Sequence, residues 1–296
     1  MNRLDRARGA LLGLAVGDAI GTTVEFKPRG SFAPLTDMVG GGPFGLLPGQ
    51  WTDDTSMALC LGYSLIETGF DVDDQMARYL RWRDTGYMSC NGRCFDIGNA
   101  TNDAIRRYRQ TGNPLSGSTH PHSAGNGSIM RLAPVPIYYM DNPDEAMAKS
   151  EEQSKTTHQV PECLQACRLL AQALVKALQG APKSEVLQFT ITQPLSKGMS
   201  HIAQGDYTSK TIDHIHGTGY VVQSLEAALW CFWKTDNFRD CVLQAANLGD
   251  DADTTAAVAG QLAGAFYGVG GIPEPWVGAL TMAEEIFELG GKLGGG

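Results

Sequence analysis

The stretch Gly249-Asp250-Asp251-Ala252-Asp253-Thr254-Thr255 decides how this chain folds, together with Trp51-Thr52-Asp53-Asp54-Thr55, which lies far earlier in the sequence. Each stretch packs carboxylates and hydroxyls just before an apolar run with helical character. If the fold brings the two together, their oxygens line a single pocket. The two ends of the chain must then close on each other within one domain.

A pocket lined with oxygen suits hard divalent cations such as Mg²⁺ or Mn²⁺ and does not suit zinc. Four carboxylates, those of Asp53, Asp54, Asp251 and Asp253, would balance the charge of two such ions. Without a cation, carboxylates packed together repel one another and raise one another's pKa. The charge balance therefore predicts a site for two metal ions.

Helix capping is the alternative explanation. Asp and Thr are favoured at helix N-caps, and acidic residues suit the positive end of the helix dipole. The same alternative applies to Asp96, as an N-cap for a helix over 98–110. Three acids within the four positions 250–253 are more charge than a cap requires, so we favour the metal site.

The composition is that of a globular protein with a sizeable core: 296 residues, 43% of them hydrophobic. The net charge of −9 and the lack of a basic block disfavour a nucleic-acid groove. We expect no membrane span, and no signal peptide, because the first apolar segment contains Asp18 and lacks a cleavage site. The seven cysteines form no C-x-x-C pair, which favours reduced thiols. We expect a cytoplasmic monomer.

Apolar periodicity predicts an all-α fold, with one domain over 1–289 and a flexible glycine-rich tail over 290–296. Residues 135–139 are the one candidate strand, and their prolines argue against a central one. The helices are expected over 3–17, 54–68, 72–84, 98–110, 142–155, 161–179, 182–191, 220–234, 236–247, 253–267 and 275–289.

Glycines and loops add two expectations. Gly9, Gly13 and Gly17 recur every four residues in the first helix, which indicates close packing against another helix, because glycine otherwise weakens a helix. The loop over 112–128 is too long for a simple connection, so we expect it to be functional, whereas 195–219 reads as irregular.

Several glycine motifs accompany the acids. Asp96-Ile97-Gly98-Asn99 and Ala124-Gly125-Asn126-Gly127-Ser128 stand at expected helix starts, where bare backbone N–H groups bind phosphates and ribose hydroxyls. Neither a G-x-x-x-x-G-K-[ST] loop nor a G-x-G-x-x-G turn after a strand is present. The nucleoside-triphosphate and dinucleotide-binding folds that carry those loops are therefore disfavoured.

Taken in order, the motifs resemble those of the ADP-ribosylglycohydrolases, and most closely the dinitrogenase reductase-activating glycohydrolase branch. The resemblance covers roughly residues 5–275. The motifs that carry it are L-A-V-G-D-A-I-G with V-E-F (14–21 and 24–26), P-G-Q-W-T-D-D-T (48–55), D-I-G-N (96–99), A-G-N-G-S-I-M-R (124–131), T-T-H (156–158), G-Y-V-V (219–222) and D-A-D-T-T-A-A-V-A-G (251–260).

The resemblance implies a single all-α domain with a dinuclear Mg²⁺ or Mn²⁺ centre in a central cleft. It places Glu25 near the metals, on a loop that can cover the cleft, and Tyr220 against the adenine. By matching position, the metal ligands would be Thr52, Asp53, Asp54, Asp251, Asp253 and Thr254. The ribose near the scissile bond would contact Asp96, Gly98 and Asn99, and the diphosphate would contact Gly125, Asn126, Gly127, Ser128 and His158.

The implied activity is hydrolysis of the glycosidic bond between ADP-ribose and a modified protein side chain, most closely arginine. The partners would be the ADP-ribosylated protein and ADP-ribose, with two divalent cations as cofactors. Asp96 is the first candidate for proton transfer and Glu25 the second. Asp250 departs from the family pattern, which has glycine there, so its role stays open.

Other activities remain open at this point. Serine-linked ADP-ribose and O-acetyl-ADP-ribose are alternative substrates, and the family resemblance extends to non-catalytic lens crystallins. A two-metal phosphoesterase is disfavoured, because such sites usually recruit His or Asn and neither flanks the acidic stretches.

Overall fold

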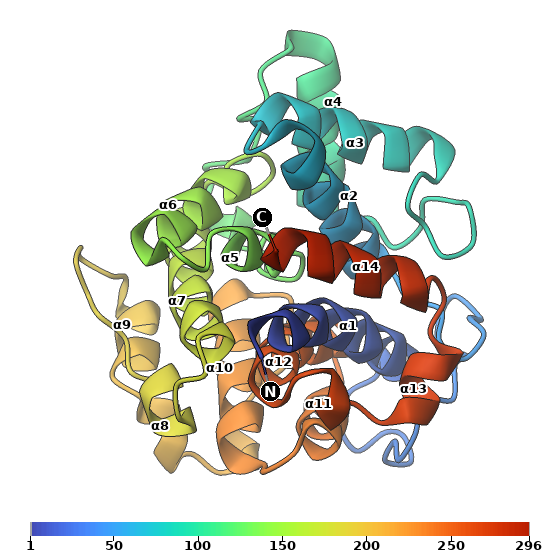
Figure 1. Cartoon of the computed structure of the whole chain (residues 1–296), viewed down its shortest axis with the longest axis vertical. Coiled ribbons are helices and arrows are strands. Elements are labelled where there is room, and N and C mark those ends of the chain that lie inside the picture. Colours follow the sequence, from blue (N-terminus) through green and yellow to red (C-terminus); the bar gives the residue numbers. More distant parts are fainter. Residues whose placement is uncertain (1, 296) are drawn as a thin grey trace.

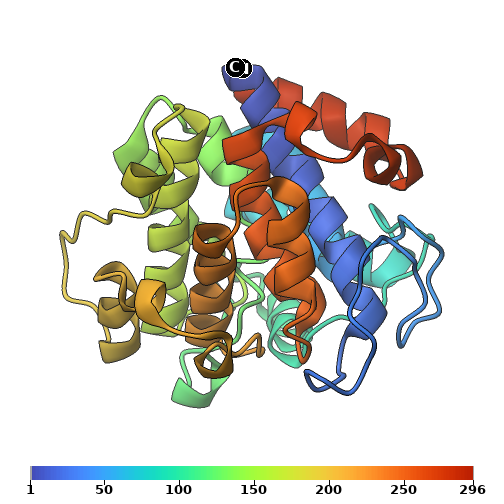
Figure 2. The same ribbon diagram turned by 90° about the horizontal axis from the view of Figure 1, so that it is seen from below.

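The centre of the fold is a close crossing of two helices, α1 (Arg3–Gly21) and α12 (Ala252–Tyr267), in a computed structural model that describes residues 2–295. A Cβ atom added to Gly13 would lie 2.2 Å from the carbonyl oxygen of Gly260, and one added to Gly17 would lie 2.1 Å from that of Ala256. The two backbones therefore touch, as the glycine spacing predicted. Figure 2 shows α1 in blue running beside the orange α12.

The other helices enclose this pair (Figure 1). From Ala7 onward, α1 buries every residue except Arg8, as expected of a helix that is apolar on all sides. Helix α14 (Ala283–Gly294) lies along α1, where Gly290 packs on Arg8 and Gly294 on Ala7.

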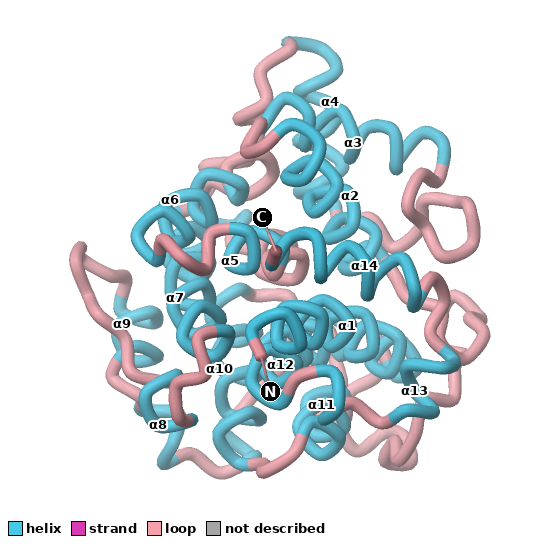
Figure 3. Tube along the Cα trace, viewed as in Figure 1, coloured by secondary structure: helices cyan, strands magenta, loops and turns pink. Residues whose placement is uncertain are grey.

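The described residues form helices and loops with isolated β-bridges and no strand, which confirms the all-α prediction (Figure 3). None of the described helices is both long and apolar enough to cross a membrane. The remaining α-helices are α2 (Asp53–Thr68), α3 (Val72–Thr85), α4 (Asn99–Thr111), α5 (Pro134–Tyr138), α6 (Pro143–Ser154), α7 (Pro161–Leu178), α8 (Lys183–Val186), α9 (Lys197–Ala203), α10 (Val221–Lys234), α11 (Phe238–Ala246) and α13 (Glu274–Ala279).

Two expectations about local structure are wrong. The candidate strand at 135–139 is instead α5 with its C-cap Tyr139, and Pro134 stands in the first turn of that helix, a position that needs no N–H donor. The helix expected over 275–289 is two helices, α13 and α14. Between them, Met282 takes a left-handed conformation and the backbone of Thr281 hydrogen-bonds Gly49 and Trp51.

Three further predictions about where helices lie differ from the structure. The tail is helical through Gly294 rather than flexible, because Leu293 is buried, while Gly296 lies outside the described residues. Helix α8 stops at Val186, well short of 191, and the chain beyond it is held at Thr190 by the Gln172 side chain. The stretch 195–219 contains the short α9, which buries Met199 and Ile202.

Helices α2, α3 and α4 form a layer of their own beside the central pair. A separate apolar cluster joins them, made of Met57, Cys60, Met76, Tyr79, Trp82, Ile105 and Met130. Residues at the starts of α2, α4 and α12 line one cleft, the candidate site.

Candidate active site

The two acidic stretches meet, as their composition predicted. The Thr52 hydroxyl lies 3.3 Å from carboxylate oxygens of both Asp54 and Asp253, and the Thr254 hydroxyl lies 3.4 Å from Asp54. These side chains stand at the first turns of α2 and α12, which the α1–α12 crossing brings together. The helix starts also direct their positive dipole ends at the carboxylates.

Local N-capping explains only part of the acidic cluster. Helix α2 has Thr52 at its N-cap, α12 has Asp251 and α4 has Gly98, and none of the three makes a side-chain capping hydrogen bond. Asp96 therefore does not cap α4, and it takes a left-handed conformation with φ of 59°. Asp253 Oδ1 accepts from the first-turn N–H of Thr254 (2.8 Å), which accounts for one of these carboxylate oxygens and leaves the others to be explained.

Asp18 is a central member of the cluster that the sequence argument did not identify. Its carboxylate accepts hydrogen bonds from the backbone N–H of Thr52 (2.9 Å) and Thr55 (3.0 Å), and from their hydroxyls at 2.9 and 2.6 Å. From near the end of α1, Asp18 thereby provides acceptors for the backbone N–H groups at the start of α2. The available signal was a lone aspartate within the apolar run 14–20.

The acids form two groups that share Asp253. Carboxylate oxygens of Asp18, Asp54 and Asp253 lie within 4.8 Å of one another, and so do those of Glu25, Asp251 and Asp253. Asp53 belongs to neither group, although it lines the cleft beside them. Of the expected metal ligands, Asp54, Asp251 and Asp253 are thus grouped together with Asp18 and Glu25.

The cluster lacks a compensating positive charge. Burial, reinforced by the neighbouring carboxylates, raises the pKa of Glu25 to about 9. Burial also raises the pKa of Asp96 to about 7 and that of Asp18 to about 6. No ion pair among the described residues includes these acids, and Oδ1 of the buried Asp54 has no hydrogen-bond partner. Divalent cations would fit this set of donors.

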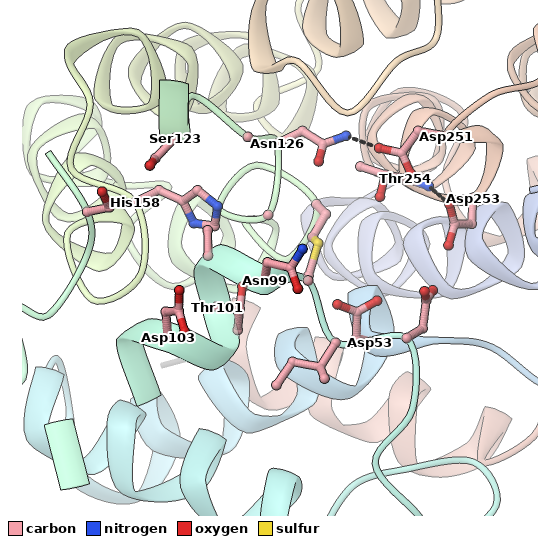
Figure 4. A pocket seen from close by; sticks show the side chains of 18 of the residues that line it. Asp53, Asn99, Thr101, Asp103, Ser123, Asn126, His158, Asp251, Asp253 and Thr254 are labelled. Atoms are coloured by element: carbon pink, nitrogen blue, oxygen red, sulfur yellow. Dashed lines mark hydrogen bonds between the residues drawn. The ribbon is translucent and has the colours of Figure 1, made fainter. Parts of the chain in front are cut away.

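An open cleft of about 830 Å³ leads away from the acids (Figure 4). Asp53, Asp251 and Asp253 lie at one side of the view, with Ser123 and His158 at the other. Of the expected substrate-binding residues, Gly98, Asn99, Gly125, Asn126, Gly127 and His158 line the cleft, as do Asp96 and Glu25.

Two expected substrate residues stand apart from the cleft wall. Ser128 is fully buried, and its hydroxyl accepts a hydrogen bond from the thiol of Cys167. Tyr220 is 41% exposed and its hydroxyl donates to Glu162, although a bridge to Gly125 keeps it beside the loop. Its role against adenine stays a prediction.

The loop 125–127 is joined directly to the acidic cluster. The Asn126 side chain donates to Asp251 (2.6 Å) and to Ser224 (3.1 Å). Gly127 has no room for a side chain, because a Cβ atom would lie 2.7 Å from Cε1 of His158. The loop thus presents bare backbone beside an imidazole.

The backbone of Asp250 joins two segments beside the acidic cluster. It takes a left-handed conformation (φ 55°), its N–H donates to Lys27 (2.8 Å), and its carbonyl accepts from Phe26 (2.7 Å). These two bonds tie the segment that carries Glu25 to the one that carries Asp251. The Asp250 side chain is not among those that line the cleft.

Further side chains line the cleft to which the sequence argument gave no role. The long loop contributes several, which agrees with its expected role, and α4 contributes others. They are Phe26, Phe44, Ile97, Thr101, Asp103, Arg107, Ser118, His122, Ser123 and Met130. Phe26, Ile97 and Met130 stand within the quoted motifs, whereas the others are scattered over several elements and no local pattern marks them.

A family model described as ADP-ribosylglycohydrolase matches residues 1–295. The chain is 47% identical over 291 residues to ADP-ribosylarginine hydrolase Tri1 of Serratia proteamaculans (strain 568), covering 98% of this chain and 79% of that protein. It is 35% identical to ADP-ribosyl-[dinitrogen reductase] glycohydrolase of Rhodospirillum rubrum, covering 95% and 92%. A solved structure titled "ADP-ribosylglycohydrolase-related protein complex" superposes with a TM-score of 0.89 at 43% identity, over 99% of this chain and 98% of that one.

Proposed function

Because this chain belongs to the ADP-ribosylglycohydrolase family, as its motifs predicted, we propose that it hydrolyses the bond between ADP-ribose and a modified arginine side chain. Such hydrolysis reverses mono-ADP-ribosylation of a protein. The observation that carries the proposal is the convergence, in one cleft, of the uncompensated acids and the bare Gly125–Gly127 loop.

The acidic cluster is the proposed site of two divalent cations, Mg²⁺ or Mn²⁺. Asp18, Asp54 and Asp253 would hold one, and Glu25, Asp251 and Asp253 the other. Thr52, Asp53 and Thr254 supply further oxygens beside them. When bound, such cations act as Lewis acids on sugar hydroxyls and water.

The rest of the cleft would position the nucleotide. Backbone N–H groups of the glycine loop and the His158 side chain suit the diphosphate, which is anionic and accepts hydrogen bonds. Asp96, Gly98 and Asn99, just before and at the start of α4, line the same cleft as that loop and the acids, and the ribose would bind against them. The scissile C1″ atom would then face the carboxylates.

Proton transfer is assigned to Asp96, with Glu25 as the second candidate. Water attacks C1″ and gives a proton to the carboxylate, the C1″–N bond breaks, and the departing guanidine takes up that proton to leave as arginine. Both carboxylates line the cleft, as such a general base must. The left-handed backbone at Asp96 is of the kind that functional sites retain.

The arginine linkage is favoured by charge. The guanidinium group of the modified arginine is cationic and planar, and the acidic end of the cleft attracts a cation. Phe26 and Phe44 also line the cleft, and Phe26 is 65% exposed, so aromatic faces are available to a guanidinium group. A serine linkage offers neither interaction.

The test is release of ADP-ribose from arginine-linked and serine-linked proteins, with Mg²⁺ or Mn²⁺ and with a chelator. Arginine-linked substrate should have the higher kcat/KM, and its advantage should shrink with added salt. Equal or faster release from serine-linked substrate would overturn the arginine assignment. Absence of release from both substrates would overturn the proposed hydrolase activity.

A further inference from the structure

Arg131 is a fully buried cation without an acidic partner. Its side chain is 0% exposed, and none of the ion pairs in the described chain includes it. Neutral acceptors take its hydrogens instead: Gly127 O at 2.9 Å, Gln153 Oε1 at 3.1 Å, Thr156 Oγ1 at 3.1 Å and Thr157 Oγ1 at 2.8 Å. Retaining a buried charge on neutral partners is costly, which points to a role beyond packing.

Thr157 connects this guanidinium group to His158. The Thr157 hydroxyl lies 2.8 Å from Nδ1 of His158, as well as 2.8 Å from the Arg131 donor. Arginine can only donate, so the Thr157 oxygen must accept from it. The hydroxyl hydrogen is then left with Nδ1 as its one hydrogen-bond partner among the described residues.

This arrangement determines the tautomer of the imidazole. If Nδ1 accepts from Thr157, the proton of the neutral ring lies on Nε2. Burial, reinforced by the charge of Arg131, lowers the pKa of His158 to about 3, so the ring is neutral under ordinary conditions. The opposite tautomer would leave the buried hydroxyl hydrogen of Thr157 without an acceptor.

The Nε2 atom faces the glycine loop. A Cβ atom added to Gly125 or to Gly127 would lie 3.3 Å from it, and the described protein offers it no hydrogen-bond partner. His158 lines the cleft together with these two glycines. An N–H group at this position is therefore free to donate to a ligand.

We propose that Arg131 is a positioning residue which, through Thr157, holds His158 as the Nε2–H tautomer, so that this N–H donates to an anionic oxygen in the cleft. The identification of that oxygen with the ADP-ribose diphosphate rests on the proposed function. The tautomer itself does not depend on the proposed function, because it follows from contacts within the protein.

The tautomer is tested by ¹⁵N NMR of the imidazole groups in the ligand-free full chain at neutral pH. The His158 signals are those missing from the spectrum of His158→Ala. We expect a protonated Nε2 and an unprotonated Nδ1, retained in Thr157→Ser and shifted toward Nδ1–H in Thr157→Val and Arg131→Met. A protonated Nδ1 in the unaltered protein, or an unchanged tautomer in Thr157→Val, would overturn the proposal. If Arg131→Met does not fold, the spectra of the two Thr157 variants decide whether Thr157 holds the tautomer.

Binding of free ADP-ribose, measured by calorimetry, tests the consequence. Thr157→Val should weaken binding about 10-fold to 100-fold, the range for one hydrogen bond to a charged group, while Thr157→Ser stays near the unaltered protein. In a His158→Ala background, Thr157→Val should not weaken ADP-ribose binding any further. An equal loss in both backgrounds would show that Thr157 does not act through His158. Absence of ADP-ribose binding in the unaltered protein would instead contradict the proposed function, and the NMR result would still decide the tautomer.

Discussion

The hydroxyl of Thr52 lies 3.3 Å from a carboxylate oxygen of Asp253, although 201 positions of sequence separate the two residues. Neither local segment brings them together. The contact depends on the α1–α12 crossing, which places the start of α12 beside Asp18 and, through Asp18, beside the start of α2. The glycines of α1 therefore determine the geometry of the acidic cluster as well as the packing of the core.

Enlarging one of these glycines should damage both stability and the site. In Gly17→Ala, the new Cβ would lie 2.1 Å from the carbonyl oxygen of Ala256, so the helices must separate. We expect a loss of about 1–3 kcal/mol in the free energy of unfolding, typical of overpacking, and weaker metal binding. Gly278→Ala is the control, because a Cβ there meets nothing within 4 Å. Equal stability of the two variants in a denaturant titration would show that the crossing is not close.

Asp96→Asn should separate catalysis from binding. Asparagine tolerates the left-handed backbone at this position, so the fold should be retained. We expect turnover to fall by roughly 10²–10⁴-fold, the usual contribution of a general acid or base, while the Kd for ADP-ribose changes little. Near-normal turnover in single-turnover kinetics would remove Asp96 from proton transfer and assign that role to Glu25.

Stabilisation by a metal should increase with pH. The folded pKa values of Asp18, Asp96 and Glu25 are raised to about 6, 7 and 9, above their ordinary values of 3.8, 3.8 and 4.5. A carboxyl with a raised pKa stabilises the fold below its ordinary pKa, and that stability is lost as the pH rises through the folded value. The metal-free protein should therefore lose stability between about pH 4 and about pH 9.

Bound cations favour the ionised carboxylates and should offset that loss. The rise in Tm on adding Mg²⁺ to chelator-treated protein should consequently be larger at about pH 8.5 than at about pH 6. Differential scanning fluorimetry at the two pH values checks this. A Tm increase that is equal at both, or larger at the lower pH, contradicts the assignment of these acids to the metal site.

The sequence predicted what depends on local chemistry and missed what depends on distant partners. Asp53, Asp54, Asp251 and Asp253 were recognisable because their neighbours in sequence are also acids and hydroxyls. Asp18 was not, because the donors that it satisfies lie 34 and 37 positions away. The side chains of Phe26, Phe44 and the long loop likewise reach the cleft only through tertiary structure.

The misplaced helix ends have the same cause. The break between α13 and α14 has no glycine or proline at its left-handed residue, Met282, so no local signal marks it. The glycine-rich end of the chain reads as flexible by composition. It is helical through Gly294 because its small residues pack directly on α1, where Gly290 meets Arg8.

If the acidic cluster holds two divalent cations, chelator-treated protein should take up a defined number of Mn²⁺ ions per chain, which elemental analysis counts. The unaltered protein should bind two ions. Asp253→Asn, which removes the carboxylate shared by both groups of acids, should bind fewer, with its helical circular dichroism retained. An unaltered protein that binds no Mn²⁺, or an Asp253→Asn variant that binds as many ions as the unaltered protein, would contradict the account.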